Sequence, residues 1–96
     1  MFTLNNSILN ESVEILSVVP NPAKDFFRIN YYLTDQLAEY KFRILDFKGN
    51  LIEELACNRN SSFLDMTITN YPSGLYFVSL VKNGAIRKAQ RLIIIK

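Results

Sequence analysis

Residues 75–95 have the sequence LYFVSLVKNGAIRKAQRLIII, in which two apolar-rich runs flank the pair Asn83-Gly84. Side chains alternate between the two faces of an extended chain, so Tyr76, Val78 and Leu80 would share one face of the first run. Asn-Gly between two such runs is typical of a type I′ hairpin turn, because both central residues of that turn adopt positive φ. The segment therefore predicts an antiparallel β-hairpin.

The same two-residue period recurs upstream. Phe27, Ile29 and Tyr31 would share a buried face of one strand, with Arg28 and Asn30 on its other face. Nowhere do apolar residues keep the i, i+3, i+4, i+7 spacing of an amphipathic helix. The pattern predicts seven strands, over Val13–Val19, Phe26–Leu33, Tyr40–Phe47, Leu51–Ala56, Phe63–Ile68, Leu75–Lys82 and Ile86–Ile95.

Prolines and glycines mark the connections between these strands. Pro20-Asn21-Pro22 should end the first strand in a rigid turn, because proline fixes φ and removes a backbone donor. Gly49 can take positive φ in the turn after Asp46, and we expect the Asp46 carboxylate to cap that turn. Tyr71-Pro72-Ser73-Gly74 predicts a second tight connection.

These elements predict an all-β fold. Short antiparallel strands joined by turns favour an immunoglobulin-like antiparallel β-sandwich, with a small barrel as the alternative. The 96 residues suffice for one domain, which we expect over residues 11–96. Met1–Asn10 has no strand pattern and is predicted to be a linker. It also lacks the pattern of a signal peptide, and no run approaches the ~20 apolar residues of a membrane span.

The residue types argue against an enzyme and against a metal or cofactor site. The chain contains no histidine and a single cysteine, Cys57. It therefore lacks the commonest metal ligand and the usual proton-transfer side chain. It also lacks a phosphate-cradling glycine loop and a pair of acids placed to cooperate. We expect Cys57 to serve as a small apolar side chain.

Charge is distributed unevenly along the chain. The formal net charge is +2, yet all nine acids lie at or before Asp65. This small total and the absence of a recognised motif argue against a nucleic-acid partner. The basic tail has two interpretations, a binding surface or cations that prevent an edge strand from pairing with other chains. Its members are Lys82, Arg87, Lys88, Arg91 and Lys96.

Four segments in fixed order resemble the C-terminal sorting domain of the type IX secretion system of Bacteroidetes. Each segment alone is only a turn or a strand, and the resemblance depends on their joint order and spacing. Tyr71 departs from the leucine that the family prefers, and the basic residues of the tail are dispersed. The segments are Val19-Pro20-Asn21-Pro22-Ala23, Ile44-Leu45-Asp46-Phe47-Lys48-Gly49, Leu64-Asp65-Met66 followed by Tyr71 to Val78, and the basic last strand ending at Lys96.

This resemblance implies a function in protein export. The domain would follow an N-terminal cargo in the same precursor, pass through the periplasm and be recognised by outer-membrane translocon or shuttle proteins. A separate sortase-like cysteine peptidase would then cut it off, in the linker before Glu11, as the cargo reaches the cell surface or the medium. Any leader that starts export would lie upstream of this sequence.

The candidate site residues fall into two groups. One group is expected to contact the translocon, and the other consists of family residues with a structural role. The first group comprises Gly74, Tyr76, Lys82, Arg87, Lys88, Arg91 and Lys96, and the second comprises Pro20, Asn21, Pro22, Asp46, Gly49, Asp65 and Pro72.

Two other functions fit a small sandwich. One is an immunoglobulin-like adhesion or carbohydrate-binding module, because sandwich domains often bind through loops or exposed aromatic side chains. The other is a structural module that self-associates through an exposed edge strand.

Overall fold

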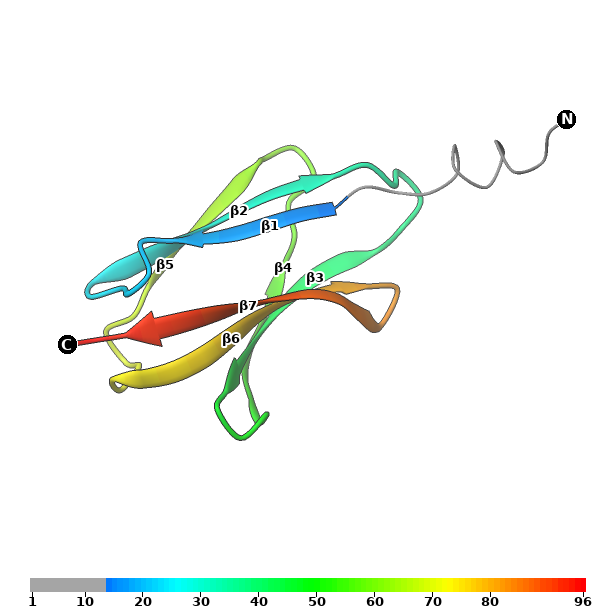
Figure 1. Cartoon of the computed structure of the whole chain (residues 1–96). Coiled ribbons are helices and arrows are strands. Elements are labelled where there is room, and N and C mark those ends of the chain that lie inside the picture. The colour runs from blue at the N-terminus through cyan, green and yellow to red at the C-terminus, as the bar shows by residue number, and fades with distance from the viewer. Residues whose placement is uncertain (1–13) are drawn as a thin grey trace, which may run out of the picture.

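The computed structural model describes residues 14–96, which form seven strands and no helix (Figure 1). This part of the chain thus contains no helix that could cross a membrane. Val13, the predicted linker Met1–Asn10 and the expected domain start at Glu11 lie outside the described residues. The strands are β1 (Glu14–Val19), β2 (Phe26–Leu33), β3 (Tyr40–Asp46), β4 (Leu51–Ala56), β5 (Phe63–Thr67), β6 (Gly74–Lys82) and β7 (Ala85–Ile94).

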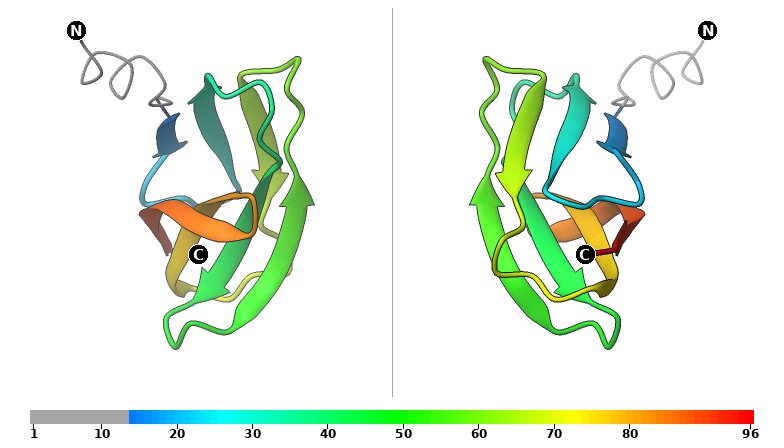
Figure 2. Two further views of the ribbon diagram at one scale, coloured as in Figure 1. Left: turned by 90° about the vertical axis from the view of Figure 1, so that its right-hand side faces the viewer. Right: turned by 90° about the vertical axis from the view of Figure 1, so that its left-hand side faces the viewer.

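The strands form two antiparallel sheets that pack face to face (Figure 2). One sheet has three strands in the order β1-β2-β5, and the other has four in the order β4-β3-β6-β7. The prediction of an all-β sandwich is confirmed. The sheets do not close into the barrel that was its alternative, because β4 and β5 end separate sheets.

Alternation along the strands builds the core between the sheets. Phe27 and Ile29 of β2 are fully buried, as are Phe42 and Ile44 of β3. The ring of Tyr31 meets that of Phe42 edge to face, with centroids 5.0 Å apart. These side chains occupy the inward positions that the two-residue period predicts.

Strand ends differ from the predicted bounds by a residue where the backbone turns to another partner. β3 ends at Asp46, because the backbone N–H groups that follow bond to that aspartate. β5 ends before Ile68, whose N–H donates to the Asp25 carbonyl at 3.3 Å. β7 ends at Ile94, since the next N–H, that of Ile95, donates to the Ala23 carbonyl at 2.9 Å.

The first and last strands lie side by side and close one edge of the sandwich (Figure 1). Ala23, just after β1, forms a parallel bridge to Ile94 of β7. The opposite edge is formed by β4 and β5, which the segment 57–62 connects. The chain therefore brings the beginning of the domain against its C-terminal hairpin.

Candidate functional site

The C-terminal hairpin turns at Asn83-Gly84, as the sequence predicts. Asn83 has φ of 50° and Gly84 has φ of 85°, which is the backbone of a type I′ turn. The side-chain oxygen of Asn83 also accepts the Glu39 N–H at 2.9 Å. Its own N–H donates to the Glu39 carbonyl at 2.8 Å. The turn is thereby fixed to the start of β3.

The hairpin exposes most of its second strand. Every residue from Ala85 to Arg91 is exposed, whereas Leu92 and Ile94 are buried in the core. The buried end holds β7 to the sandwich, and the exposed part presents its side chains to solvent. This exposed part contains three of the residues predicted to contact the translocon, namely Arg87, Lys88 and Arg91.

Glu14, the first residue of β1, forms a buried ionic cluster with this hairpin. Its side chain is only 2% exposed and accepts bonds from Arg87 at 2.9 Å and from Lys82 at 3.5 Å. The Tyr40 hydroxyl donates to the same carboxylate at 2.8 Å. A carboxylate buried to this degree needs such partners, because desolvation of an unpaired charge is very unfavourable.

Lys82 has a second acidic partner at the rim of the cluster. Its ammonium lies 3.0 Å from an oxygen of Asp35, and this hydrogen bond lowers the pKa of that carboxyl. Burial and the hydrogen bond to Glu14 raise the pKa of Tyr40 to about 12. Although all nine acids lie at or before Asp65 in the sequence, Lys82 and Arg87 of the basic tail both have acidic partners in the fold. Their partners lie too far away in sequence for local charge patterning to reveal them.

Lys88 and Arg91 remain solvent-facing cations. Neither forms an ion pair within residues 14–96, and both are exposed. Lys88 lies opposite Leu80 and Arg91 opposite Phe77 in the β6–β7 ladder. Their side chains therefore leave opposite faces of the strand, so the cations of the tail do not form one patch.

The turn at Pro20-Asn21-Pro22 lies along the free edge of β7. The amide nitrogen of Asn21 donates to the Arg91 carbonyl at 2.6 Å, and its amide oxygen accepts the Ile93 N–H at 2.9 Å. The Asn21 side chain thus forms hydrogen bonds with the edge of β7 as a neighbouring strand would, and the backbone of Ala23 forms the next bonds along that edge. The first strand ends in a turn where the sequence predicts one, and this turn occupies backbone groups of β7 that edge-strand pairing would need.

Tyr76 and Gly74 support the start of β6. The Tyr76 hydroxyl donates to the Pro72 carbonyl at 2.5 Å, and its ring lies 5.5 Å from that of Tyr71. Tyr71 is itself buried and donates to Glu53 at 2.5 Å, which with burial raises its pKa. Gly74 has φ of 156°. These residues shape the turn and the core, and only Gly74 and Pro72 reach the surface.

The family residues Asp46 and Asp65 make contacts within the fold. The Asp46 carboxylate accepts the N–H groups of Lys48 and Asn50, each at 2.9 Å, and these bonds lower its pKa. The prediction that Asp46 caps its turn is confirmed, with Gly49 at φ of 89°. Asp65 forms an ion pair with Arg28 at 2.7 Å.

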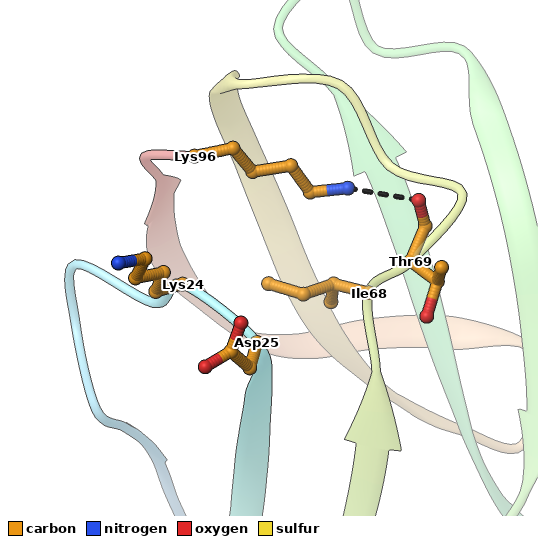
Figure 3. A pocket seen from close by; sticks show the side chains of 5 residues that line it. All are labelled: Lys24, Asp25, Ile68, Thr69 and Lys96. Carbon is orange, nitrogen blue, oxygen red and sulfur yellow. Dashed lines mark hydrogen bonds between the residues drawn. The ribbon is translucent and has the colours of Figure 1, made fainter.

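Lys96 lines a hollow of about 320 Å³ at the end of the sandwich (Figure 3). Its ammonium reaches across to donate to the Thr69 carbonyl at 2.9 Å, and its backbone N–H donates to Ser73 at 2.9 Å. Lys24 lies on the other side of the hollow, and its ammonium points away from Ile68. Lys96 therefore fastens the end of the chain instead of pointing freely to solvent.

The described residues offer no metal cluster, and their one thiol is not activated. No group of three or more His, Cys, Asp or Glu residues within 14–96 could hold a metal ion. Burial raises the pKa of Cys57, which disfavours the reactive thiolate. Cys57 packs against the core, as predicted for a small apolar side chain.

Comparison with known families decides what the fold is for. The model of a secretion system C-terminal sorting domain matches residues 17–96, which is most of the chain. The chain belongs to this family. Such a domain is the C-terminal signal that directs a cargo protein through the type IX secretion system, so its cargo is exported to the cell surface or secreted. The family is a sorting signal and not a catalytic one.

Among solved structures, the sorting domain is similar to part of dimeric latent PorU from Porphyromonas gingivalis. The TM-score is 0.70 and the identity 18%. The match covers 88% of this chain and 9% of the PorU chain, so it shows a shared domain fold. No curated protein matches the chain.

Proposed function

We propose that the export machinery recognises this sorting domain through its C-terminal hairpin, with Lys88 and Arg91 as the charged contacts. The observation that supports this proposal is the division among the cations of β7. Arg87 is bound internally to Glu14, whereas Lys88 and Arg91 are exposed and outside every ion pair of residues 14–96. Exposed charges without internal partners add nothing to folding and are available for a binding partner.

The partner would be an outer-membrane translocon or shuttle protein of the type IX system, met from the periplasm. Because Lys88 and Arg91 leave opposite faces of β7, this partner would have to contact the strand from both sides, as a cleft with acidic walls does. Gly74 and Tyr76 would contribute through the shape of the β6 entry. Lys82, Arg87 and Lys96 would act indirectly by holding the hairpin in place.

We also propose that a sortase-like cysteine peptidase removes the domain by cutting before Glu11. The structure supports this position because Glu14 already belongs to the folded body, through its bonds to Tyr40, Lys82 and Arg87. A cut upstream of β1 would leave the domain intact. Mass spectrometry of the domain released into the medium should find an N-terminus at or upstream of Glu11, whereas an N-terminus downstream of Glu11 would contradict the proposal.

The recognition proposal is tested by fusing this chain to the end of a periplasmic reporter in a host with type IX machinery. The double variant Lys88→Glu/Arg91→Glu should lower the amount of reporter at the surface and in the medium at least tenfold. The control is Lys48→Glu, which reverses an exposed cation in the turn between β3 and β4, remote from β7. A host without the translocon defines the background.

Two results would contradict the recognition proposal. One is normal export of the double variant, and the other is an equal loss of export in Lys48→Glu. Thermal unfolding of the purified variants must match that of the parent domain, so that loss of export is not loss of fold. Since both residues are exposed, we expect only the small change in unfolding temperature that is usual for surface substitutions.

A further inference from the structure

The three-stranded sheet turns an apolar face to solvent. Five large apolar side chains from β1, β2 and β5 lie there, and none of them belongs to the core. We call this surface the aromatic face. Its members and their exposed fractions are Ile15 at 54%, Val19 at 48%, Phe26 at 48%, Tyr32 at 58% and Phe63 at 43%.

Strand register places these residues together. Ile15 lies opposite Tyr32, and Val19 lies opposite Arg28. Phe26 is two residues before Arg28 in β2, so both side chains are on the same side of that strand. Phe63 lies opposite Asn30 on the other flank of β2. Directly opposite side chains on one face of a sheet are in contact range, so the five surround a small centre formed by Arg28 and Asn30.

The fold does not need these side chains to be apolar. The alternating inward residues, among them Leu16, Val18 and Phe27, already fill the core. An antiparallel sheet with one solvated face normally carries polar residues there, because that face has no layer to cover it. Large apolar side chains in those positions are typical of a surface that another protein covers.

The charges on the aromatic face balance. Arg28 and Asp65 are the charged residues on this side of β1, β2 and β5, and they form a two-bond ion pair at 2.7 and 3.0 Å among the five apolar side chains. The Arg28 guanidinium also stacks over the Phe63 ring at 4.0 Å. The pair gives the face a dipole and no net charge.

The outer face of the other sheet differs in charge. There Lys41 and Arg43 share the single acid Glu54, and Arg91 adds another cation opposite Phe77. A basic face of this kind repels a copy of itself. The aromatic face carries no net charge and does not repel a second copy. In a two-fold arrangement the dipoles of the two copies point in opposite directions.

We propose that the aromatic face is a self-association site, on which a second copy of this chain packs face to face about a two-fold axis. The axis would pass between Arg28 and Asp65, so that Arg28 of each copy faces Asp65 of the other. The apolar residues of the two copies would cover one another around this charged centre. Such an isologous contact uses the same patch twice and closes at two subunits.

The area of the face predicts a weak dimer. An aromatic side chain can bury roughly 150–250 Å², so three that are about half exposed offer roughly 300 Å². With Ile15 and Val19 the patch reaches about 400–500 Å² per copy, as large as the largest patch on a typical monomer. Two copies would bury about 1,000 Å², the lower limit of specific interfaces. We therefore expect dissociation constants of about 10–100 µM.

The test uses the whole chain in sedimentation equilibrium from about 10 µM to about 1 mM, the range that brackets the expected affinity. The parent chain should change from monomer to dimer. Tyr32→Ser and Phe26→Ser should each weaken the dimer at least tenfold. Phe47→Ser and Ile86→Ser remove comparably exposed apolar side chains elsewhere and should leave it unchanged.

A charge exchange separates the proposed contact from a loss of fold. Arg28→Asp leaves two acids on the aromatic face, and Asp65→Arg leaves two arginines, so each variant should repel its own copies. An equimolar mixture of the two should form a heterodimer, because the altered faces are complementary. Misfolded variants would not be rescued by mixing.

Three results would overturn the proposal. A parent chain that stays monomeric at about 1 mM would show that the face does not bind a second copy. Equal weakening by Phe47→Ser or Ile86→Ser would place the contact elsewhere. Amide resonances that shift on dilution along the outer edges of β4 or β7, and not in β1, β2 and β5, would show edge-strand pairing in place of face packing. These measurements use no export machinery, so they fail or succeed independently of the recognition proposal.

Discussion

At the scale of single residues, Glu14 connects the beginning of the domain to its end. Its carboxylate is buried and bonded to Tyr40, Lys82 and Arg87, which belong to three other strands. Glu14→Gln keeps the size of the side chain but removes the negative charge. Arg87 would then lose the carboxylate that it binds at 2.9 Å, and Lys82 would keep Asp35 as its acidic partner.

We expect Glu14→Gln to lower the free energy of unfolding by about 2–4 kcal/mol. Removing one partner of a buried ion pair costs about 3–5 kcal/mol, and the partial exposure of Arg87 reduces that loss. Urea denaturation measures it. The matched control is Glu54→Gln, which breaks exposed pairs with Lys41 and Arg43 and should cost at most about 1 kcal/mol. Equal losses in the two variants would contradict a special role for Glu14.

Asp46 predicts how stability depends on acid. Its pKa lies below the ordinary value of 3.8, chiefly because the Asn50 N–H donates to the carboxylate. The ionised form is therefore favoured in the folded state. Its stabilising contribution is complete above pH 3.8 and disappears as pH falls through the lower folded pKa. Asp46→Asn should flatten that part of the stability curve, measured by urea unfolding at successive pH values. An unchanged acid slope would show that the turn does not need the charge.

At the scale of elements, the turn before β2 protects the edge of β7. Asn21 supplies one donor and one acceptor to the β7 backbone, at Arg91 and Ile93. Asn21→Ala removes both bonds and should lower the free energy of unfolding by about 1–2 kcal/mol. It should also speed hydrogen exchange at the Ile93 amide. Asn21→Asp is the comparison variant, because it keeps the acceptor for Ile93 and puts a carboxylate oxygen, which repels the Arg91 carbonyl, in place of the donor. An Ile93 exchange rate that stays the same in Asn21→Ala would contradict the model of a capped edge.

The C-terminal turn depends on the positive φ of Gly84 as well as on the side chain of Asn83. A Cβ at Gly84 would meet no atom within 4 Å, yet the residue has φ of 85°. Gly84→Ala should therefore destabilise the domain through strain, by about 1–2 kcal/mol, without any clash. Chemical denaturation measures this cost. Asn83→Gly keeps the turn geometry and the backbone bond to Glu39 but loses the side-chain bond, which separates the two contributions. A stabilised Gly84→Ala variant would contradict the type I′ assignment.

The strands were predictable because their pattern is local. Alternation along β2 and β6 identifies which side chains face the core, and Asn83-Gly84 identifies the hairpin, all within a few residues of sequence. The long-range contacts of Glu14 were not predictable, since Glu14 lies 68 residues from Lys82 and 73 from Arg87. The edge contact of Asn21 with β7 spans a similar separation, 72 residues to Ile93. These contacts decide which cations of the basic tail are bound within the fold and which are exposed. Sequence alone could therefore not separate Arg87 from Lys88 and Arg91.

At the scale of the whole molecule, contacts between β1 and β7 make the two ends of the domain interdependent. β1 and β7 belong to different sheets, and their shared edge is joined by the Glu14 cluster at one end and by Asn21 and Ala23 at the other. β1 and the turn after it therefore hold β7, whose ladder partner is β6, against the three-stranded sheet. A recognition surface on the hairpin would thus report that the whole domain has folded.

This interdependence predicts how truncations will behave. Deleting residues 91–96 removes the buried Leu92 and Ile94, each worth about 2–5 kcal/mol, together with the backbone partners of Asn21. That sum is comparable to the entire stability of a small domain, so we expect no cooperative unfolding transition in circular dichroism. Deleting only Ile95 and Lys96 removes bonds to Ala23, Ser73 and Thr69 and should cost about 1–3 kcal/mol with the fold retained. If the longer deletion still unfolded cooperatively near the parent midpoint, β7 would be dispensable for folding. If the longer deletion folds, its loss of export can be assigned to lost recognition. If it does not fold, only the variant Lys88→Glu/Arg91→Glu can test recognition.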